Sequence, residues 1–304
     1  MSKKNFKSGF VAILGRPNVG KSTLLNALLG SKISIVSDIP QTTRYQIKGI
    51  LNLKNAQIVF VDTPGMHSFK DSLTSYLNIV AKRALEGCDL ILYVVDVSRP
   101  VGIEEKNLMN IIGGQNIKTF MVLNKIDLGT KFFNDYIDLW NKKAEEKDRT
   151  GQLLYFIPVS AKTDKNIDKL KDALIENLPN AEPYYDKESS TDFPLKFRIA
   201  DIIREKLFLN LKEELPHSLA VEVQKIEYRG KLIYIKVNIF VKRDSQKVIV
   251  IGRSGNMLKE IGKLSRMEIE DIYKKKVFLD IWVKVLKDWH QKPRILQELG
   301  YGVA

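Results

Sequence analysis

Residues 10–22 read FVAILGRPNVGKS, a short apolar run followed by a turn that lies between Gly15 and Gly20 and continues into Lys21 and Ser22. The apolar run predicts a buried strand, and the residues after the turn predict the start of a helix. Glycines let successive backbone N–H groups curl around an anion, and the positive end of the helix adds to the attraction. Lys21 could bridge two phosphates, and the Ser22 hydroxyl could ligate Mg²⁺. The stretch therefore predicts a loop that holds the phosphates of a nucleotide.

The composition is that of a globular protein with about two domains. The chain has 304 residues, of which 44% are hydrophobic, and we expect neither a membrane span nor a signal peptide. The single cysteine, Cys88, cannot form an internal disulfide or a zinc site alone, and we interpret it as a small buried thiol in a reducing, cytoplasmic compartment. The net charge of +13 favours an anionic partner, either nucleic acid or a membrane surface.

Apolar runs and helical patterns alternate over the first 180 residues, which predicts an α/β domain with a mostly parallel, doubly wound sheet. The predicted strands are 9–14, 57–62, 90–96, 119–124 and 155–159. The predicted helices are 21–29, 74–86, 103–112, 131–145 and 166–177. Such sheets bind ligands at the carboxyl ends of their strands. We expect this domain to occupy residues 1–180.

A second, smaller domain follows a polar segment that contains three prolines, PNAEPYYDKESSTDFP at residues 179–194. We interpret residues 181–194 as a linker. Beyond it, residues 195–304 change to an α+β pattern with the element order αββααβ. Its predicted elements are a helix at 195–213, strands at 219–227 and 232–242, a helix–turn–helix at 248–272 and a strand at 277–285.

Three further motifs end later strands of the first domain: DTPG (residues 62–65), NKID (124–127) and VSAK (159–162). The carboxylate of Asp62 would lie where Mg²⁺ must be, and the Gly65 N–H could meet a γ-phosphate. The carboxylate of Asp127 could accept both N1–H and the 2-amino group of guanine, and the Ala161 N–H could approach guanine O6. Adenine lacks both donors and would leave a buried acid unpaired, so the pattern predicts sharp selection for guanine.

In this order the four motifs resemble those of the GTPase superfamily, and the resemblance covers residues 8–178. It implies hydrolysis of GTP to GDP with Mg²⁺ as cofactor. The residues expected to bind the nucleotide are Gly15, Asn18, Val19, Gly20, Lys21, Ser22, Thr23, Asp62, Gly65, Asn124, Lys125, Asp127, Ser160, Ala161 and Lys162. The expected catalytic residues are Lys21, Thr43 and Gly65, and the expected metal ligands are Ser22, Thr43 and Asp62.

The switch segment SDIPQTTRYQIKG (residues 37–49) is expected to supply the threonine that caps Mg²⁺ in related GTPases. Thr43 is the candidate and Thr42 the alternative; both could instead simply open the strand that follows. Met66 stands where many GTPases have a glutamine that orients water, so we expect slow intrinsic hydrolysis. Asn18 resembles an asparagine that helps to hold K⁺ in related GTPases, and a monovalent cation could then supply positive charge beside the phosphates.

The second domain carries a second glycine turn, Ile251-Gly252-Arg253-Ser254-Gly255, between two predicted helices. Residues 228–267 around it hold ten basic residues against two acidic ones. The arrangement resembles a KH domain of the second type, whose Gly-x-x-Gly loop approaches the backbone of a single-stranded nucleic acid. The residues expected to contact RNA are Ile251, Gly252, Arg253, Ser254, Gly255, Lys259, Lys263 and Arg266. Ile249, Ile251 and Ile261 could floor the groove or belong to the core.

A GTPase domain followed by this KH type is a narrow combination, and with QTTR, DTPGMH, KKKVFLDIWVKV and LGY the chain resembles the Era family of bacterial GTPases over residues 8–302. The resemblance implies binding to the 3′ end of 16S ribosomal RNA, assistance to the maturation of the small (30S) ribosomal subunit, and no DNA partner. The family is also described as loosely membrane-associated. The alternative is therefore a GTPase that regulates the cell cycle or division by contacting the cell membrane through its basic face. SDIP before QTTR and Ser254 in the turn depart from the family pattern.

The remaining conspicuous side chains suggest structural roles. The three histidines lack metal-ligand spacing, so no further metal site is expected. Trp282 is interpreted as a core residue of the last strand. Trp289 and Tyr301 are interpreted as anchors of the C-terminal tail.

Overall fold

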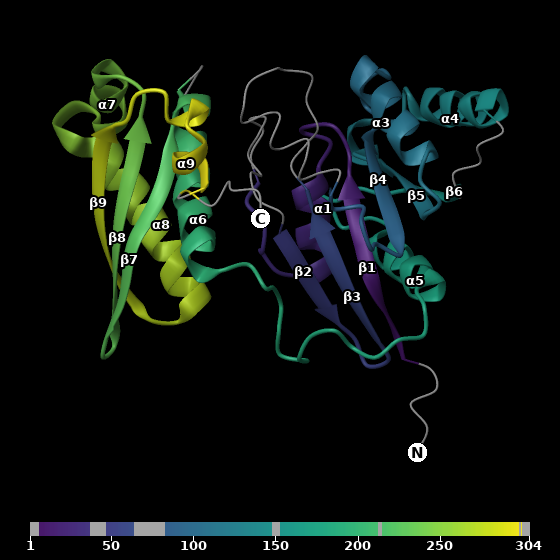
Figure 1. Cartoon of the computed structure of the whole chain (residues 1–304), viewed down its shortest axis with the longest axis horizontal. Coiled ribbons are helices and arrows are strands. Elements are labelled where there is room, and N and C mark those ends of the chain that lie inside the picture. Colours follow the sequence, from purple (N-terminus) through teal and green to yellow (C-terminus); the bar gives the residue numbers. More distant parts are fainter. Residues whose placement is uncertain are drawn as a thin grey trace. The chain divides into compact units, whose positions relative to one another are not determined.

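The computed structural model describes residues 6–36, 47–63, 83–147, 153–211, 215–297 and 299 (Figure 1). These residues form two compact units, the first extending to Asp192 and the second beginning at Phe193. Each unit has its own hydrophobic core, so each can be understood from its own sequence.

The first unit is built on one six-stranded sheet with the strand order β2-β3-β1-β4-β5-β6. The strands are β1 (Lys7–Leu14), β2 (Ile47–Asn52), β3 (Ala56–Asp62), β4 (Leu90–Asp96), β5 (Lys118–Asn124) and β6 (Leu153–Pro158). All pairings are parallel except that of β2 with β3, so β2 is an antiparallel edge strand. The prediction of a mostly parallel, doubly wound α/β domain is confirmed.

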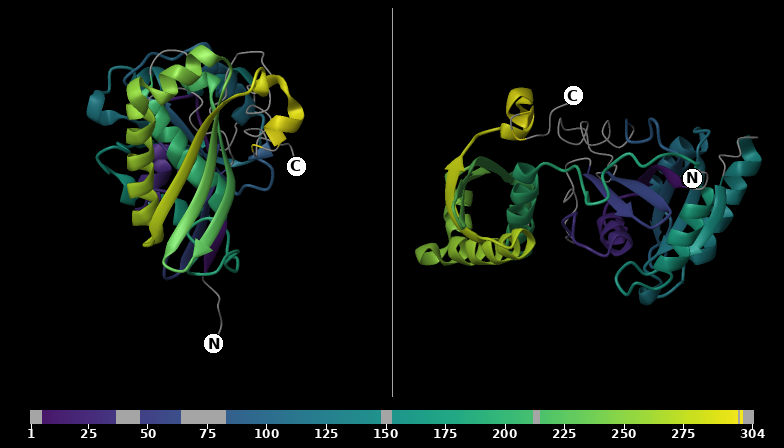
Figure 2. Two further views of the ribbon diagram at one scale, coloured as in Figure 1. Left: turned by 90° about the vertical axis from the view of Figure 1, so that its left-hand side faces the viewer. Right: turned by 90° about the horizontal axis from the view of Figure 1, so that it is seen from below.

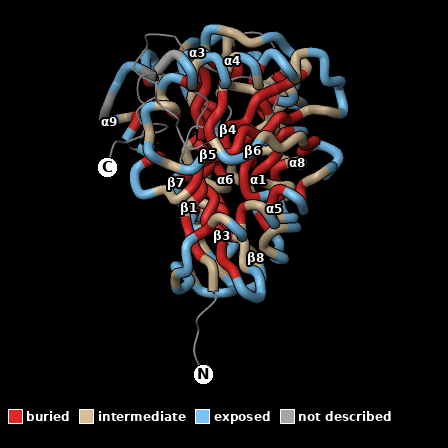
Figure 3. The backbone as a smooth tube through the Cα atoms, turned by 90° about the vertical axis from the view of Figure 1, so that its right-hand side faces the viewer, coloured by how far each residue is buried: buried red, intermediate tan, exposed pale blue. Residues whose placement is uncertain are grey.

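Helices cover both faces of this sheet because the buried strands are apolar on both sides. On β1, Val11 and Ile13 belong to the core beneath α1 and α5, whereas Ala12 and Leu14 belong to the core beneath α3 and α4. Figure 3 shows the buried strands in red inside an exposed layer in pale blue. The described helices are α1 (Lys21–Leu29), α3 (Ile103–Gly113), α4 (Phe133–Lys147) and α5 (Ile167–Asn177), with a 3₁₀ turn η1 (Ile126–Leu128). Most of the helix predicted at 74–86 lies outside the described residues.

The polar segment before the second unit is bound to the edge of the first sheet. We call residues 184–192 the β2 strap. The Ile50 N–H donates to the Ser190 carbonyl (2.9 Å), and Thr191 forms an antiparallel bridge with Gly49. The fully buried side chain of Gln57 accepts the N–H of Tyr185 (3.0 Å) and donates to its carbonyl oxygen (2.8 Å). Much of the predicted linker is therefore hydrogen-bonded to the first unit.

The second unit has the predicted element order αββααβ. Its elements are α6 (Leu195–Asn210), η2 (Pro216–Ser218), β7 (Ala220–Arg229), β8 (Leu232–Val241), α7 (Asp244–Ile251), η3 (Arg253–Gly255), α8 (Asn256–Tyr273), β9 (Lys276–Val285), η4 (Trp289–Gln291) and α9 (Pro293–Leu296). The sheet order is β7-β8-β9; β8 runs antiparallel to β7 and parallel to β9. Helices α6 and α8 pack on one side of this sheet (Figure 2).

The structure of this unit bears on five residues that the sequence analysis interpreted singly. Trp282 is not a core residue: 56% of it is exposed, because the neighbouring Val283 takes the inward position. Ile261 is fully buried in the core and does not floor a groove, whereas Ile249 is 55% exposed. Trp289 is fully buried, and its Nε1–H donates to the Ser218 carbonyl (3.0 Å). Tyr301 lies outside the described residues.

The described residues also bear on membrane-spanning helices, metal-binding clusters and the single thiol. None of the helices in this part of the chain is long and apolar enough to cross a membrane. Nor do the described His, Cys, Asp and Glu side chains form a group of three that could hold a metal. Cys88 donates its thiol hydrogen to the Ala84 carbonyl (2.8 Å), and burial raises the pKa of the thiol to about 12.

Candidate functional site

The loop between β1 and α1 adopts a conformation that only its glycines permit. A Cβ atom on Gly15 would lie 2.5 Å from the Val94 carbonyl oxygen. Gly20, immediately before α1, has φ of 95°, and a Cβ there would lie 2.4 Å from Asn124 Nδ2. Both distances are too short for any side chain, so the backbone itself lines the loop and its N–H groups are accessible to an anion.

Lys21 lies across this loop rather than away from it. Its Nζ donates to the carbonyl oxygens of Gly15 (3.0 Å) and Arg16 (2.9 Å), and only 7% of the residue is exposed. Burial lowers the pKa of the amine to about 8, although the charges of Asp62 and Glu104 act in the opposite direction. A phosphate placed here would add the negative charge that stabilises the protonated amine.

The predicted metal ligands Ser22 and Asp62 meet at the edge of the loop. Ser22 Oγ donates to Asp62 Oδ2 (2.9 Å), and so does Ser34 Oγ (3.0 Å). The other carboxylate oxygen, Oδ1, is buried and has no hydrogen-bond partner among the described residues. Burial raises the pKa of Asp62 despite the nearby Lys21 amine. A hydroxyl beside an unsatisfied carboxylate oxygen fits Mg²⁺, which prefers oxygen ligands.

Five residues named in the sequence predictions either lie outside the described residues or, within them, form no side-chain hydrogen bond with the groups above. Thr43 and Gly65 are outside the described residues, as is Met66. Thr23 is partly buried in the first turn of α1, and Lys162 is exposed after β6. Ser34 was not predicted; its only signal is a hydroxyl that follows α1 closely in sequence.

The motifs at the ends of β5 and β6 are tied to the phosphate loop by one buried amide. Asn124 Nδ2 donates to the Val19 carbonyl (2.8 Å), and Asn124 Oδ1 accepts the N–H of Ala161 (3.0 Å). Ser160 Oγ donates to Asp127 Oδ1 (2.6 Å) and so orients that carboxylate. The Ala161 N–H, expected to approach guanine O6, is thus bonded to Asn124. The structure brings all five of these residues together at one end of the sheet.

Lys125 forms a second connection to the phosphate loop. Its Nζ donates to the Asn18 carbonyl (2.7 Å) and pairs with Asp96 Oδ2 (2.8 Å). Asp96 is 1% exposed; burial alone would raise its pKa, but hydrogen bonds from Lys125 and Ser98 hold it below the usual value. Asp96 was not among the predicted site residues, although an acidic residue at the end of the apolar strand LILYVVD could have indicated a place in the site.

A buried ion pair supports the loop from the side of α3. Arg16 Nε contacts Glu105 Oε1 (2.6 Å), and Glu105 Oε2 accepts the N–H of Gly102 (2.9 Å). Glu105 is 1% exposed, so its buried negative charge must be stabilised by the Arg16 guanidinium and the Gly102 N–H. The pair was not predicted, because nothing local in the sequence joins residues so far apart.

The glycine turn of the second unit joins α7 to α8 and is open to solvent. Arg253 and Ser254 are exposed, and Gly252 has φ of 74° with Met257 so close that a Cβ would lie 2.6 Å from Met257 Cβ. Gly255 has φ of 76°, but a Cβ there would meet nothing within 4 Å. Gly252 therefore shapes the turn, whereas Gly255 leaves space beside it.

A groove of about 450 Å³ extends from this turn between α8 and β9. Its basic side chains are those of Lys259, Lys263 and Arg266, all three exposed. Its apolar residues are Leu258, Val277, Phe278, Leu279 and Ile281. Ile251 is partly buried against the core instead. Gly255 of the predicted turn and the three predicted basic residues thus line one groove with an apolar floor and a positive rim.

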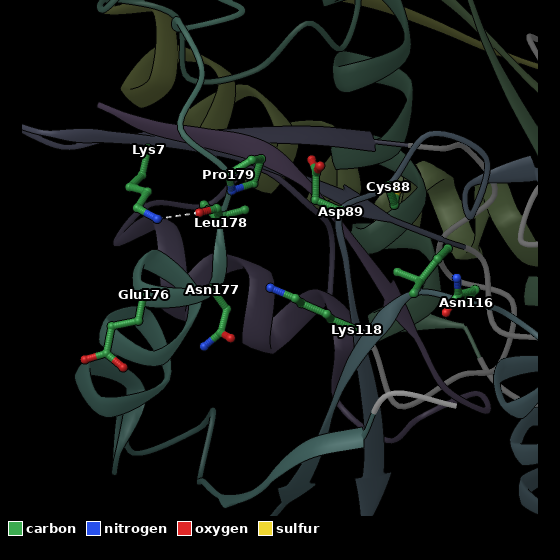
Figure 4. Close-up of a pocket in the computed structure, with 10 residues that line it drawn as sticks. Lys7, Cys88, Asp89, Asn116, Lys118, Glu176, Asn177, Leu178 and Pro179 are labelled. Atoms are coloured by element: carbon green, nitrogen blue, oxygen red, sulfur yellow. Dashed lines mark hydrogen bonds between the residues drawn. The ribbon is translucent and has the colours of Figure 1, made fainter. Parts of the chain in front are cut away.

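A pocket of about 380 Å³ lies at the opposite ends of the first unit's strands (Figure 4). It contains none of the predicted site residues. Lys7 donates to the Leu178 carbonyl (2.8 Å), and Asp89 accepts the N–H of Phe10 (2.8 Å). These charged groups have structural partners, and the strand carboxyl ends remain the candidate nucleotide site.

Comparisons with known proteins agree with both sites. Residues 10–125 match the family described as 50S ribosome-binding GTPase, and residues 214–290 match the KH domain family. The chain is 44% identical to GTPase Era of Geobacter metallireducens over 303 residues, covering 99% of this chain and 100% of the relative. It is 42% identical to GTPase Era of a Thermoanaerobacter species, covering 98% and 97%.

Two solved structures resemble the whole chain. A variant of Era from Aquifex aeolicus bound to GDP and AlF₄⁻ matches with a TM-score of 0.91 and 39% identity, covering 98% of this chain and 100% of that one. Era in complex with MgGDPNP and nucleotides 1506–1542 of 16S ribosomal RNA matches with a TM-score of 0.90 and 38% identity, with the same coverage. On these findings the chain belongs to the Era family of GTPases, with a GTPase domain followed by a KH domain.

Proposed function

We propose that this GTPase is a nucleotide-controlled RNA-binding protein of the cytoplasm that binds the 3′ end of 16S ribosomal RNA and assists assembly of the 30S subunit. The observation that carries the proposal is the pairing of a phosphate loop with a basic-rimmed groove in one chain. A relative with 38% identity over nearly the full length was crystallised with nucleotides 1506–1542 of that RNA.

In the first unit, the loop from Gly15 to Gly20 would hold the phosphates, and Lys21 would neutralise them. Ser22 and Asp62, with Thr43, would hold Mg²⁺, which when bound stabilises negative charge on the phosphates. Asp127, oriented by Ser160, would accept the guanine N–H groups. The Met66 side chain can neither donate nor accept a proton, so it cannot orient the attacking water. We therefore propose that intrinsic hydrolysis is slow.

In the second unit, the turn would approach the RNA backbone while the groove takes about four nucleotides. Arg253, Lys259, Lys263 and Arg266 would contact phosphates, and the apolar floor would contact bases. The same cations could meet an anionic membrane, but a flat lipid surface needs neither an open glycine turn nor an apolar groove. RNA is therefore the partner that we propose.

Binding of a labelled 16S 3′-end RNA and a scrambled RNA of equal length tests the proposal, each with GDP and with a non-hydrolysable GTP analogue. We expect preference for the 16S sequence and an affinity that differs between the two nucleotides. Equal binding in all four conditions would contradict the proposal.

Gly255→Asp places a negative side chain beside the turn without a steric clash and should greatly weaken RNA binding. Gly230→Asp is the matched control, because Gly230 also has positive φ (61°) and open space around it, but lies in the β7–β8 turn. GTP affinity should stay unchanged in both variants. Equal RNA binding by the two variants would remove the glycine turn from the proposed interface.

A further inference from the structure

Part of the second unit's sheet, on the side opposite α6 and α8, is left exposed by the described helices. Ile235, Val237 and Ile239 of β8 point into the core beneath α6 and α8. Because strand side chains alternate, Tyr234 of β8 and Phe278 and Trp282 of β9 point to the opposite side. Phe278 is 55% exposed and Trp282 is 56% exposed. Large rings with half their area in water are not explained by core packing.

These rings are held in fixed positions. The Arg229 guanidinium lies 4.3 Å from the centre of the Tyr234 ring, and the Tyr234 and Phe278 rings are stacked with centroids 5.9 Å apart and planes 12° apart. Asp280 accepts the Tyr234 hydroxyl (2.7 Å) and the Trp282 Nε1–H (2.8 Å). We call Arg229, Tyr234, Phe278 and Trp282 the aromatic face. Its geometry is set before any partner arrives.

The aromatic face is bordered by lysines that form no ion pair within the described part of the chain. Lys236, Lys276 and Lys284 alternate onto the same side of the sheet, and they make no ion pair with the residues that the structure describes. Of the acidic residues on this side, Glu227 is paired with Lys225 and Arg229, whereas Asp280 and Glu222 accept hydrogen bonds from uncharged side chains. The surface therefore offers ring faces together with lysines that have no ion-pair partner among the described residues.

This combination matches the chemistry of single-stranded RNA. Bases stack on aromatic side chains and on arginine planes, while lysines contact the phosphates between them. The core of a protein–protein interface is depleted of lysine, whereas this face has lysines beside its rings. Phe278 also lines the groove between α8 and β9. The groove and the aromatic face are thus continuous across the edge strand β9.

We infer that the aromatic face is a second RNA-binding surface, on which nucleotides that leave the α8–β9 groove stack on Phe278, Tyr234 and Trp282. The inference rests on the proposed RNA-binding function of the groove. It predicts that affinity depends on RNA length beyond the segment that the groove holds.

The test compares a labelled RNA of about four nucleotides, the length that a KH loop clamps, with one of about twelve. Trp282→Ala and Tyr234→Ala should each weaken binding of the longer RNA by about 5- to 150-fold, the range for loss of one stacked base, and leave the shorter RNA unaffected. Tyr228→Ala is the matched control, since Tyr228 is 61% exposed but pairs with Ile233 on the other side of the sheet.

Tryptophan fluorescence gives an independent measurement. Trp140 and Trp289 are buried, which leaves Trp282 as the exposed one of three tryptophans. The longer RNA should quench its emission and protect it from iodide. Trp282→Phe should abolish the quenching but retain most of the affinity, because the ring can still stack.

The outcomes separate the two proposals. If Gly255→Asp weakens both RNAs but Trp282→Ala and Tyr234→Ala weaken neither, the aromatic face is not an RNA surface and is left for a protein partner. If neither RNA binds the unchanged protein, the proposed RNA-binding function of the groove is contradicted, and the inference that rests on it is contradicted as well. Equal effects of Trp282→Ala and Tyr228→Ala would also overturn the inference.

Discussion

Replacing Asn124 by Ala tests whether this residue holds the nucleotide loops together. The change removes the donor to the Val19 carbonyl and the acceptor of the Ala161 N–H, and Asn124 is 1% exposed. A buried polar group that loses its partner costs about 1–3 kcal/mol, so two such groups should lower the free energy of unfolding of the first unit by about 2–6 kcal/mol. That is a large fraction of a typical domain's stability of about 5–15 kcal/mol.

Native-state hydrogen exchange is the suitable assay because it reports on each unit separately. Amides of β1 and β5 should lose protection by that amount, while those of β8, in the other unit, provide an internal reference. Asn177→Ala is the matched control, since among the described residues Asn177 Nδ2 donates to the Ala173 carbonyl of its own helix and to no other group (3.0 Å). A loss below about 1 kcal/mol for Asn124→Ala, or one equal to that of the control, would refute the reasoning.

The remaining predictions concern charge, base choice, the glycine turn and cation dependence. Because the pKa of Lys21 is lowered to about 8, GDP affinity should fall as pH rises through 8, by at most about tenfold per pH unit, whereas the stability of the free protein should rise between about pH 8 and 10.5. Titration calorimetry and urea unfolding across that range would show the opposite trends, and a flat GDP affinity would contradict them. Asp127→Asn should weaken GTP binding by about 100-fold or more and favour xanthosine triphosphate; unchanged GTP affinity would remove this residue from base recognition. Gly252→Ala should lower the unfolding free energy of the second unit by about 1–3 kcal/mol more than Gly255→Ala, as urea unfolding would reveal, since only the former meets a neighbouring atom; equal losses would argue against the clash. If Asn18 helps to hold K⁺, GTP hydrolysis should be faster in potassium than in sodium buffer, and equal rates would dismiss that role.

The phosphate loop and its neighbours could be placed from the sequence because parallel strands end at one edge of their sheet. That rule brings together Ser22, Asp62 and Asn124, which lie far apart in the chain. The sequence could not show that Asn124 and Ala161 bond to each other. Which of several convergent groups become partners depends on distances of a few tenths of an ångström, and strand patterns do not carry that information.

The side of β9 that is buried could be predicted from the sequence, and the interpretation of Trp282 as a core residue did not use that signal. In VFLDIWVKV all five odd-numbered positions are apolar, whereas the even-numbered positions include Asp280 and Lys284, so alternation marks the odd-numbered side as the buried one. The structure agrees, since Val277 and Val283 pack inward while Phe278 and Trp282 remain outside. The error over Trp282 therefore concealed the aromatic face.

The β2 strap determines where the two units can be separated by truncation. A chain ended at residue 180 would remove the acceptor of the Ile50 N–H and both donors to the buried Gln57 Oε1, the N–H groups of Tyr184 and Tyr185, although Gln57 Nε2 would still donate to Asn52 Oδ1 (2.7 Å). An unpaired sheet edge of this kind recruits other chains and aggregates. A chain ended at Asp192 would keep these bonds and also the Lys48–Asp192 pair (3.0 Å). The soluble fragment for isolated nucleotide-binding work therefore ends about a dozen residues later than composition suggests.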